Sequence, residues 1–227
     1  MEKISIITGG SSGLGKEIAK LLVAKGEKVL LVARNQERLN AAKKEMGDLA
    51  MVMAGDLCDE AFVKSIFVEL NKKELYPNYL FNCAGVGIYN EPQNVDLDQI
   101  KKTMDSNTIG LMNISYEALR NMPEGGTLVN VASTAALKGN ANESLYCASK
   151  WAVRGFTEAL QAYYKKKSIH VIGVYPGGMN TPFWANEDFL KPDVNKFMDP
   201  KEVAEQIVFA TSDKNTLYNS TLIIDRK

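Results

Sequence analysis

The segment TGGSSGLG, residues 8–15, follows a short apolar run and leads directly into helical sequence. Glycines at such a position let the backbone turn sharply and approach a pyrophosphate closely. The helix that follows offers free N–H groups and a partial positive charge at its N-terminus. A glycine-rich turn by itself is also compatible with a simple tight loop. Its place after the first of several strands favours a dinucleotide-binding site, made by Gly9, Ser11, Ser12, Gly13, Leu14 and Gly15.

Strand-like and helical patterns alternate along the rest of the chain. The predicted strands are 4–8, 28–33, 50–54, 79–84, 127–132, 170–175 and 220–225, and the predicted helices are 15–25, 35–46, 59–72, 96–121, 143–167 and 200–211. Because the strands are apolar on both faces, they are typical of a parallel sheet that helices cover on both sides. The sequence therefore predicts an α/β fold of the Rossmann type: a doubly wound, seven-stranded parallel sheet. Gly26 is the expected C-terminal cap of the first helix, and Asp96, Asp199 and Pro200 are expected helix starts.

Composition limits the classes of partner. The 227 residues are enough for one large core, so we expect a single domain over residues 1–227. Lysine plus arginine equals aspartate plus glutamate at 27 each, and the formal net charge is zero. The longest basic run, 165–167, is explained by a solvated helix end. This balance disfavours binding to nucleic acid or to an anionic membrane surface.

Cysteine usage and the N-terminus indicate the compartment. Cys58, Cys83 and Cys147 are an odd number and lack the spacing of metal ligands, so we predict no metal site and a reducing environment. The apolar run before Gly9 is too short for a signal peptide or a membrane span. We expect a soluble, cytoplasmic protein.

The end of the second predicted strand bears on which dinucleotide binds. An NAD site typically has a carboxylate there to hydrogen-bond the adenosine ribose. Here Ala33 is followed by Arg34, and a guanidinium suits a 2′-phosphate. Arg38 adds a second charge one helical turn later. The alternative is that Arg34 only solvates a strand end, but the pattern favours NADP(H) over NAD(H).

Tyr146 and Lys150 stand four positions apart in helical sequence and therefore on one helix face. A snorkelling lysine beside a half-buried tyrosine is the plain interpretation. The functional one is a phenol, with an ordinary pKa of about 10, that a neighbouring ammonium makes more acidic. Hydride transfer to a carbonyl develops negative charge on oxygen and needs such a proton donor. Ser133, thirteen residues before Tyr146, can donate a further hydrogen bond to that oxygen.

Several ordered motifs resemble the short-chain dehydrogenases/reductases along nearly the whole chain. They are the glycine spacing T-G-x-x-x-G-x-G of the compact branch, Asp56-Leu57, Asn82-Cys83-Ala84-Gly85, Asn107, the S-x12-Y-x-x-x-K pattern, and Pro176-Gly177 with Thr181. One departure is Cys83, which replaces the second asparagine of the family's N-N-A-G. The resemblance implies an oxidoreductase that interconverts a carbonyl and an alcohol.

The resemblance also assigns roles. It implies a catalytic set of Asn107, Ser133, Tyr146 and Lys150. It adds Arg34, Asp56, Leu57, Asn82, Ala84, Gly85, Tyr146, Lys150, Pro176, Gly177 and Thr181 to the glycine loop as cofactor-binding residues. It further implies a small-molecule substrate and a homodimer or homotetramer built on the two long helices. The alternative is a nucleotide-sensing or scaffold relative with little turnover.

One long irregular stretch, 176–199, holds three prolines and several aromatic residues. A segment of this length in a compact domain is more often a lid or binding loop than an error of assignment. Met179, Phe183, Trp184 and Phe189 are compatible both with packing inside the loop and with an apolar substrate wall. For Asp56 and Asn82, satisfying backbone groups at strand ends stays open as an alternative role.

Overall fold

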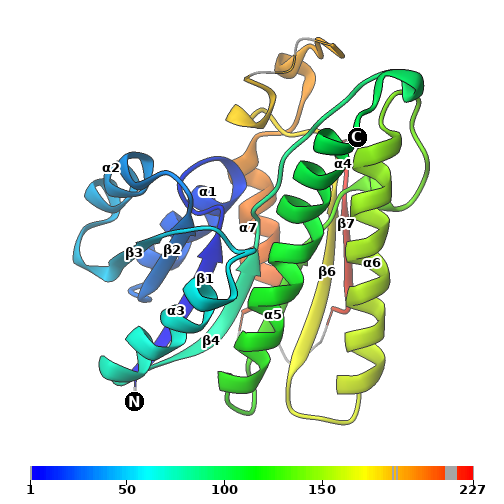
Figure 1. Cartoon of the computed structure of the whole chain (residues 1–227). Helices are drawn as coiled ribbons and strands as arrows, with labels where there is room; N and C mark the ends of the chain where they lie inside the picture. Colours follow the sequence, from blue (N-terminus) through cyan, green and yellow to red (C-terminus); the bar gives the residue numbers. More distant parts are fainter. Residues whose placement is uncertain (1, 186, 188, 213–218, 227) are drawn as a thin grey trace.

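Seven parallel strands form one sheet in the computed structural model of the chain, which describes residues 2–185, 187, 189–212 and 219–226. The strands are β1 (Glu2–Thr8), β2 (Val29–Ala33), β3 (Ala50–Ala54), β4 (Leu75–Asn82), β5 (Thr127–Val131), β6 (His170–Pro176) and β7 (Thr221–Ile224). Their order across the sheet is β3-β2-β1-β4-β5-β6-β7, and every neighbouring pair is parallel. The predicted doubly wound, seven-stranded parallel sheet is confirmed (Figure 1).

Helices cover both faces of the sheet. The helices are α1 (Gly13–Ala24), α2 (Gln36–Met46), α3 (Glu60–Lys72), α4 (Leu97–Met104), α5 (Gly110–Asn121), α6 (Ser144–Tyr164) and α7 (Pro200–Ala210). Alternate residues of β1 enter opposite cores, because successive strand side chains point to opposite faces. Ile6 packs with α3, α5 and α6, whereas Ile7 packs with α1, α2 and α7. Within the described ranges, no helix is long and apolar enough to cross a membrane.

Helix ends follow the predicted caps. Asp96 accepts a hydrogen bond from the Gln99 main-chain N–H, and the Gln99 side chain bonds back to the Asp96 N–H, which completes a capping box. Asp199 accepts from the main-chain N–H of Lys201 at the start of α7, next to a proline in the first turn. Gly26 follows α1 with a φ of +82°, a conformation that glycine adopts without strain.

Strand β4 begins at Leu75, four residues before the predicted start at Tyr79, and ends at Asn82 rather than at residue 84. The missed residues include Pro77, which lies opposite Ile4 of β1, and the register shifts directly after Ile4. A bulge at this place accommodates a residue that cannot donate a ladder hydrogen bond. The sequence did not predict the first half of β4 because a proline and an asparagine interrupt the apolar run.

The helix predicted over 96–121 contains a π-helical segment, Asp105–Ile109, between α4 and α5. The Gly110 N–H donates to the Asp105 carbonyl, five residues back, so the chain makes one wider turn here. Such segments are rare and often lie at functional sites. The predicted site residue Asn107 lies within this turn.

The irregular stretch 176–199 contains two short 3-10 turns, Pro182–Trp184 and Val194–Lys196. Its two ends are joined by a bridge between Met179 and Met198. The Asn180 N–H donates to the Met198 carbonyl at 2.9 Å, and the Met198 N–H donates to the Gly178 carbonyl at 3.0 Å. The ends of the predicted lid are therefore pinned together, and residues 186 and 188 of that lid lie outside the described residues. Lid movement stays a prediction.

Candidate active site

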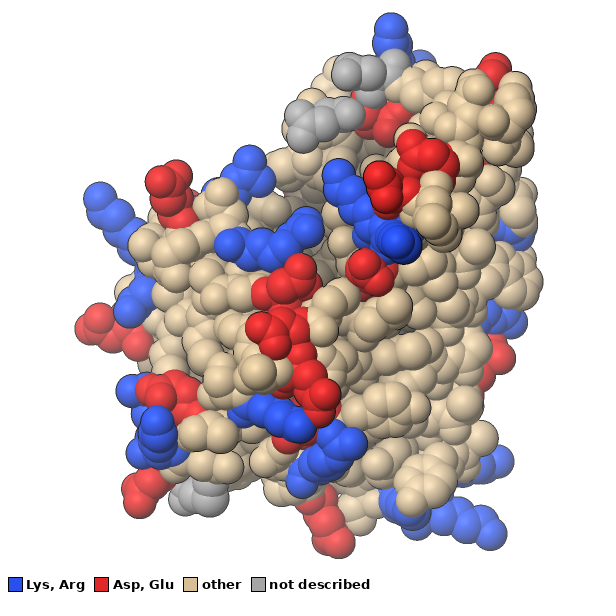
Figure 2. All heavy atoms as spheres, viewed as in Figure 1, with Lys and Arg blue, Asp and Glu red and all other residues tan. Residues whose placement is uncertain are grey.

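A cleft of about 900 Å³ lies at the carboxyl ends of the strands. The cleft extends across the carboxyl ends of β1 and β4, where the strand order reverses: β2 lies on the other side of β1, and β5 lies on the other side of β4. Open α/β sheets bind ligands at this switch point. Figure 2 shows the face with this hollow, which Lys and Arg side chains border on two sides. Residues of the glycine loop, of the ends of β4 and β5, of α6 and of the loop after β6 line the cleft.

The glycine loop forms a side-chain-free floor. A Cβ added to Gly9, whose φ is +67°, would lie 2.9 Å from the main-chain N of Ala84, and one added to Gly15 would lie 2.8 Å from the Gly9 carbonyl O. Thr8 fixes this approach, because its hydroxyl O accepts hydrogen bonds from the N–H groups of Cys83 and Ala84 at 3.1 and 3.2 Å. The loop and the end of β4 are thus held too close for any other residue.

The start of α1 is prepared for an anionic group. Ser12 stands at the N-cap, yet its side chain makes no capping hydrogen bond to the helix. Gly13 has a φ of +52°, and a Cβ there would lie 3.3 Å from the Thr181 side chain. The loop after β6 therefore closes against the glycine loop. Free helix N–H groups, an uncommitted hydroxyl and bare glycine backbone fit a pyrophosphate.

Arg34 and Arg38 line the other end of the cleft, and both are exposed. Among the described residues, neither guanidinium pairs with a carboxylate. Asn35 sets the turn between them, because its side chain accepts a hydrogen bond from the Arg38 main-chain N–H at 2.8 Å. Two unpaired guanidinium groups at the end of β2 form a local positive site for a phosphate.

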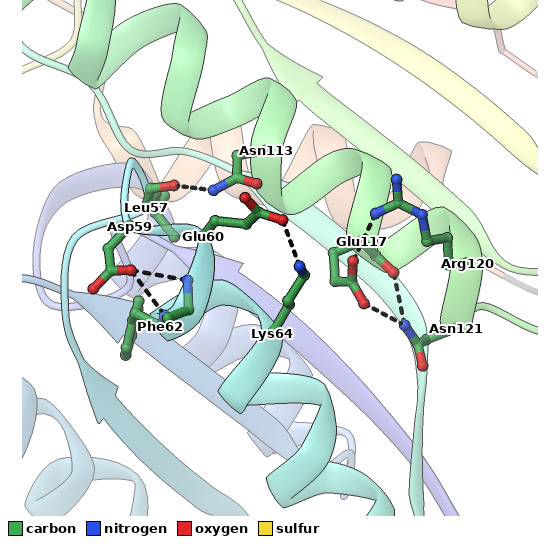
Figure 3. Close-up of polar contacts among 10 residues, drawn as sticks. Leu57, Asp59, Glu60, Phe62, Lys64, Asn113, Glu117, Arg120 and Asn121 are labelled. Carbon is green, nitrogen blue, oxygen red and sulfur yellow. Dashed lines mark hydrogen bonds and ion pairs between the residues drawn. The ribbon is translucent and has the colours of Figure 1, made fainter.

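The segment after β3 also lines the cleft and is fixed by two hydrogen bonds. The Asp56 carboxylate accepts from the Cys58 N–H at 2.9 Å, and the Leu57 carbonyl accepts from the Asn113 side chain of α5 at 2.8 Å. Figure 3 shows this second contact, together with the Glu60–Lys64 ion pair within α3 and the Glu117–Arg120 ion pair within α5. Asn113 thereby positions a stretch of the cleft wall from α5.

Tyr146, Ser133 and Lys150 meet on one wall of the cleft. Tyr146 lies in the first turn of α6, and Ser133 follows β5, where its hydroxyl O accepts a hydrogen bond from the Ala135 N–H at 3.1 Å. The Lys150 Nζ donates to the Val131 carbonyl at 3.2 Å and lies 5.7 Å from the centre of the Tyr146 ring. A side chain from a strand end and two from one helix face therefore converge beside the glycine loop.

Burial controls the acidity of these groups. It raises the pKa of Tyr146 above the usual 10, and a hydrogen bond with the Ser133 hydroxyl opposes this shift in part. Burial lowers the pKa of Lys150 from 10.5 to about 8, and the nearby Cys83 thiol opposes this shift. In this structure the Lys150 ammonium points to the Val131 carbonyl while the phenol is desolvated, so the pKa of Tyr146 is raised. That Lys150 makes the phenol more acidic during the reaction stays a prediction.

Comparisons with known proteins decide the family. The model of the short chain dehydrogenase family matches residues 3–190. The chain belongs to the short-chain dehydrogenase/reductase family. The 3-oxoacyl-[acyl-carrier-protein] reductase of Bos taurus is 34% identical over 215 residues, which cover 92% of this chain and 91% of that protein. As a member of this family, the protein is an oxidoreductase that acts on C=O and CH–OH groups.

Solved structures give the same result. A short-chain dehydrogenase/reductase from Vibrio parahaemolyticus is 32% identical, with a TM-score of 0.85 and coverage of 99% of this chain and 100% of that one. A short chain dehydrogenase from Burkholderia cenocepacia in complex with NADP is 27% identical, with a TM-score of 0.86 and coverage of 99% and 95%. This short-chain dehydrogenase/reductase thus shares its fold with family members over nearly its whole length.

Asn107 does not line the cleft of this family member. Its side chain is fully buried, where its oxygen accepts from the Val86 N–H at 2.8 Å and its amide donates to the Val86 carbonyl and the Ser149 hydroxyl, each at 3.0 Å. These bonds use both amide protons and leave nothing directed at a substrate. The side chain of Asn107 holds the loop after β4 against α6. Its membership of the catalytic set, which the resemblance implies, stays a prediction.

Asn82 is likewise absent from the cleft lining. Its side chain does not reach the cleft, because its amide donates to the Ser115 hydroxyl at 2.8 Å and to the Asn130 oxygen at 2.9 Å in the core. The side chain ties β4 to β5 and α5. A contact between Asn82 and the cofactor stays a prediction. The other predicted residues all line the cleft; they are Gly9, Ser11, Ser12, Gly13, Leu14, Gly15, Arg34, Asp56, Leu57, Ala84, Gly85, Ser133, Tyr146, Lys150, Pro176, Gly177 and Thr181.

Several cleft residues with polar or charged side chains were not predicted from the sequence, among them Tyr89, Lys102 and Glu143. Tyr89 follows the strand-end motif by a few residues, and Glu143 precedes Tyr146 by three positions, so proximity to known motifs was the available signal. The aromatic residues Phe183 and Trp184 do contact the site. The Phe183 ring lies 6.0 Å from the Tyr146 ring, which supports the wall interpretation.

Proposed function

We propose that this protein is an NADP(H)-dependent carbonyl reductase in which Tyr146 donates the proton. The observation that carries the proposal is the convergence of Tyr146, Ser133 and Lys150 on the wall of a cleft whose floor is bare glycine backbone. Such a cleft combines a site for an anionic dinucleotide with a proton donor for the developing alkoxide.

The glycine loop and the start of α1 would hold the pyrophosphate, and Thr181 and Lys150 would contact the nicotinamide end. When bound, NADPH supplies the hydride, so that a carbonyl, NADPH and a proton become an alcohol and NADP+. The chain itself binds and orients the two reactants and keeps water from the reacting carbon.

Tyr146 supplies the proton to the carbonyl oxygen. The raised pKa of this buried phenol keeps it protonated at neutral pH, as a proton donor must be. Ser133 donates a hydrogen bond to the same oxygen and so stabilises the negative charge that develops there. The Lys150 ammonium, buried on the same wall, adds positive charge to the site.

Arg34 and Arg38 support NADP(H) as the cofactor. Both side chains line the cleft and lack a carboxylate partner within the ranges that the structure describes, so a 2′-phosphate is a fitting counter-charge. No carboxylate occupies position 34, where an NAD-type site would hydrogen-bond the ribose. The NADP complex of the Burkholderia cenocepacia relative agrees with this proposal.

Absorbance of reduced nicotinamide tests the function directly. The purified protein is mixed with NADPH or NADH and a panel of ketones, aldehydes and quinones, and the loss of absorbance is followed. The proposal predicts consumption of NADPH with some member of the panel and slower consumption of NADH. Tight NADPH binding without consumption would instead support a nucleotide sensor or scaffold.

We also propose a cytoplasmic location and assembly into a homodimer or homotetramer through the long helices. The outward sides of α4, the π segment, α5 and α6 expose several large apolar side chains: Leu97, Ile100, Ile109, Tyr116 and Trp151. Large exposed apolar side chains on neighbouring elements support a covered interface. Sedimentation at several protein concentrations tests the assembly.

A further inference from the structure

The end of the cleft beside Tyr89 and Tyr146, here called the substrate end, carries two carboxylates. Glu143 lies at the N-cap of α6, and Glu187 lies in the loop after β6; both line the cleft and both are half-buried. Neither forms an ion pair with any Lys or Arg among the described residues. Lys150 of α6 also lines the cleft, but its ammonium donates its hydrogen bond to the Val131 carbonyl.

Neutral donors hold both carboxylates in place. The Glu143 Oε2 accepts from the Asn140 side-chain amide at 3.1 Å. The Glu187 Oε1 accepts from the main-chain N–H groups of Phe189 and Leu190 at 2.9 and 2.7 Å. Hydrogen bonds of this kind fix the position of a carboxylate and favour its ionised form, but they do not cancel its charge. The substrate end therefore keeps two carboxylates that no ion pair among the described residues neutralises.

Aromatic rings form the rest of this end. Tyr89 is 6% exposed, and the Trp184 ring stacks on it at 5.6 Å with an angle of 9° between the planes. The Tyr146 ring lies 5.4 Å from the Tyr89 ring. The Tyr89 hydroxyl makes no hydrogen bond to another residue in the part of the chain that the structure describes, although it lines the cleft.

The two carboxylates and the aromatic rings lie around the same part of the cleft. After burial, the negative charges around Tyr89, which include those of Glu143 and Glu187, contribute to the raised pKa of its phenol. Aromatic faces attract cations, and the attraction grows when water is excluded. A buried aromatic side chain with a free hydroxyl, beside two unpaired carboxylates, is complementary to an ammonium group and not to an anion.

We infer that the carbonyl substrate carries a positively charged amine, which binds between Glu143, Glu187 and the rings of Tyr89 and Trp184. Glu143 stands at the N-cap of α6, three residues before Tyr146, and its negative charge contributes to the raised pKa of both Tyr146 and Tyr89, so the carboxylate lies near both phenols. The amine therefore lies within a few bonds of the reacting carbonyl. The substrate class is an amino ketone whose amine and carbonyl are separated by only a few bonds. In the reverse direction it is the corresponding amino alcohol.

The inference rests on the proposed function, so its probes are chosen to report binding and turnover separately. Phenacyltrimethylammonium is an aryl ketone with a permanent positive charge, and 3,3-dimethyl-1-phenylbutan-1-one is its neutral isostere. Benzoylacetate is the anionic counterpart. Calorimetry on the protein saturated with NADP+ measures binding of each compound, and NADPH consumption measures reduction.

We expect the cationic ketone to bind about tenfold or more tightly than its neutral isostere, because a charged contact is worth about 1.5–3 kcal/mol. Benzoylacetate should bind most weakly of the three. Glu143→Gln and Glu187→Gln should each remove most of the preference for the cation, since glutamine keeps an acceptor oxygen but not the charge. The matched control is Glu60→Gln, because Glu60 pairs with Lys64 on the surface of α3, away from the cleft (Figure 3).

Charge-dependent binding that disappears in Glu143→Gln and Glu187→Gln supports the inference, even if no ketone is reduced and the proposed reductase activity fails. Equal binding of the cation and its isostere would overturn it. A preference that survives both glutamine variants, or that falls equally in Glu60→Gln, would also overturn it, whatever the turnover.

Discussion

The Lys150 Nζ lies 5.7 Å from the centre of the Tyr146 ring, and its hydrogen bond goes to the Val131 carbonyl at 3.2 Å. The two side chains share one face of α6, but the ammonium points to the strand end and not to the phenol. Lys150 is 5% exposed, and among the described residues it has no carboxylate partner. The fold thus keeps a buried amine beside the cleft, and this costs stability.

Lys150→Met should raise the free energy of unfolding of the protein measured without ligands. The fall in the Lys150 pKa from 10.5 to about 8 corresponds to at most about 3 kcal/mol below pH 8, where the folded chain must bury a charge. Between pH 8 and 10.5 the unfolded chain binds more protons, so the wild type gains stability relative to the variant as pH rises. Above about pH 10.5 the charge-related difference disappears.

Chemical denaturation at several pH values measures this difference. Lys64→Met is the control, because Lys64 is exposed and pairs with Glu60 on the helix surface. The control should show no such pH dependence between pH 8 and 10.5. A Lys150→Met variant less stable than the wild type at about pH 7 would contradict the prediction.

The two directions of the reaction should respond oppositely to pH. Burial raises the pKa of Tyr146, so the phenol stays protonated through the neutral range. A general acid acts below its pKa and a general base above it. Carbonyl reduction should therefore not fall between about pH 6 and 8 through loss of the Tyr146 proton, whereas alcohol oxidation should rise with pH. Profiles of kcat/KM in both directions test this, and oxidation that is fastest at acidic pH would refute the assignment.

Much of the fold could be predicted because it depends on local pattern. The apolar runs and the glycine loop predicted the number of strands and their parallel direction, whereas their order across the sheet comes from the structure. The first half of β4 was hidden because Pro77 and Asn78 interrupt the run, and only pairing with β1 makes them part of a strand. The π-helical turn around Asn107 was not predicted, because the periodicity of apolar residues does not show where a helix contains one extra residue in a turn.

The site was predictable where function depends on backbone, and less so where it depends on side-chain direction. Gly9 and Gly15 were identified because their role is the absence of a side chain. Asn82 and Asn107 stand at motif positions, yet their side chains turn into the core, a choice that partners distant in sequence decide. Tyr89 was missed because only tertiary packing brings it to Tyr146.

Arg34→Asp should shift the cofactor preference from NADPH towards NADH. The change removes a guanidinium partner of the 2′-phosphate and supplies a carboxylate acceptor for the ribose. Loss of a charged hydrogen bond typically costs about 1.5–3 kcal/mol, or roughly ten- to a hundredfold in affinity. Dissociation constants of both cofactors, compared with an exposed-surface control such as Arg120→Asp, measure the change. An unaltered ratio would mean that specificity resides elsewhere, with Arg38 as the next candidate.

The loop after β6 should become protected when ligands bind. Its ends are joined at Met179 and Met198, and its aromatic residues Phe183 and Trp184 pack on Tyr146 and Tyr89. Closure over a ligand would bury these rings further and exclude water. Hydrogen exchange of residues 182–185 and 189–195, with and without NADP+ and an alcohol, tests the prediction. Strong and equal protection in both states would show a fixed wall.

The central claim is that Tyr146 is the proton donor, and Tyr146→Phe tests it most directly. The variant keeps the ring that packs against Tyr89 and Phe183 and removes only the hydroxyl. NADPH consumption with a reducible carbonyl and the NADPH dissociation constant are measured on the same samples. We predict that turnover falls by about a hundred- to ten-thousandfold while NADPH affinity is nearly unchanged. A Tyr146→Phe variant that reduces the carbonyl at the wild-type rate would contradict the account.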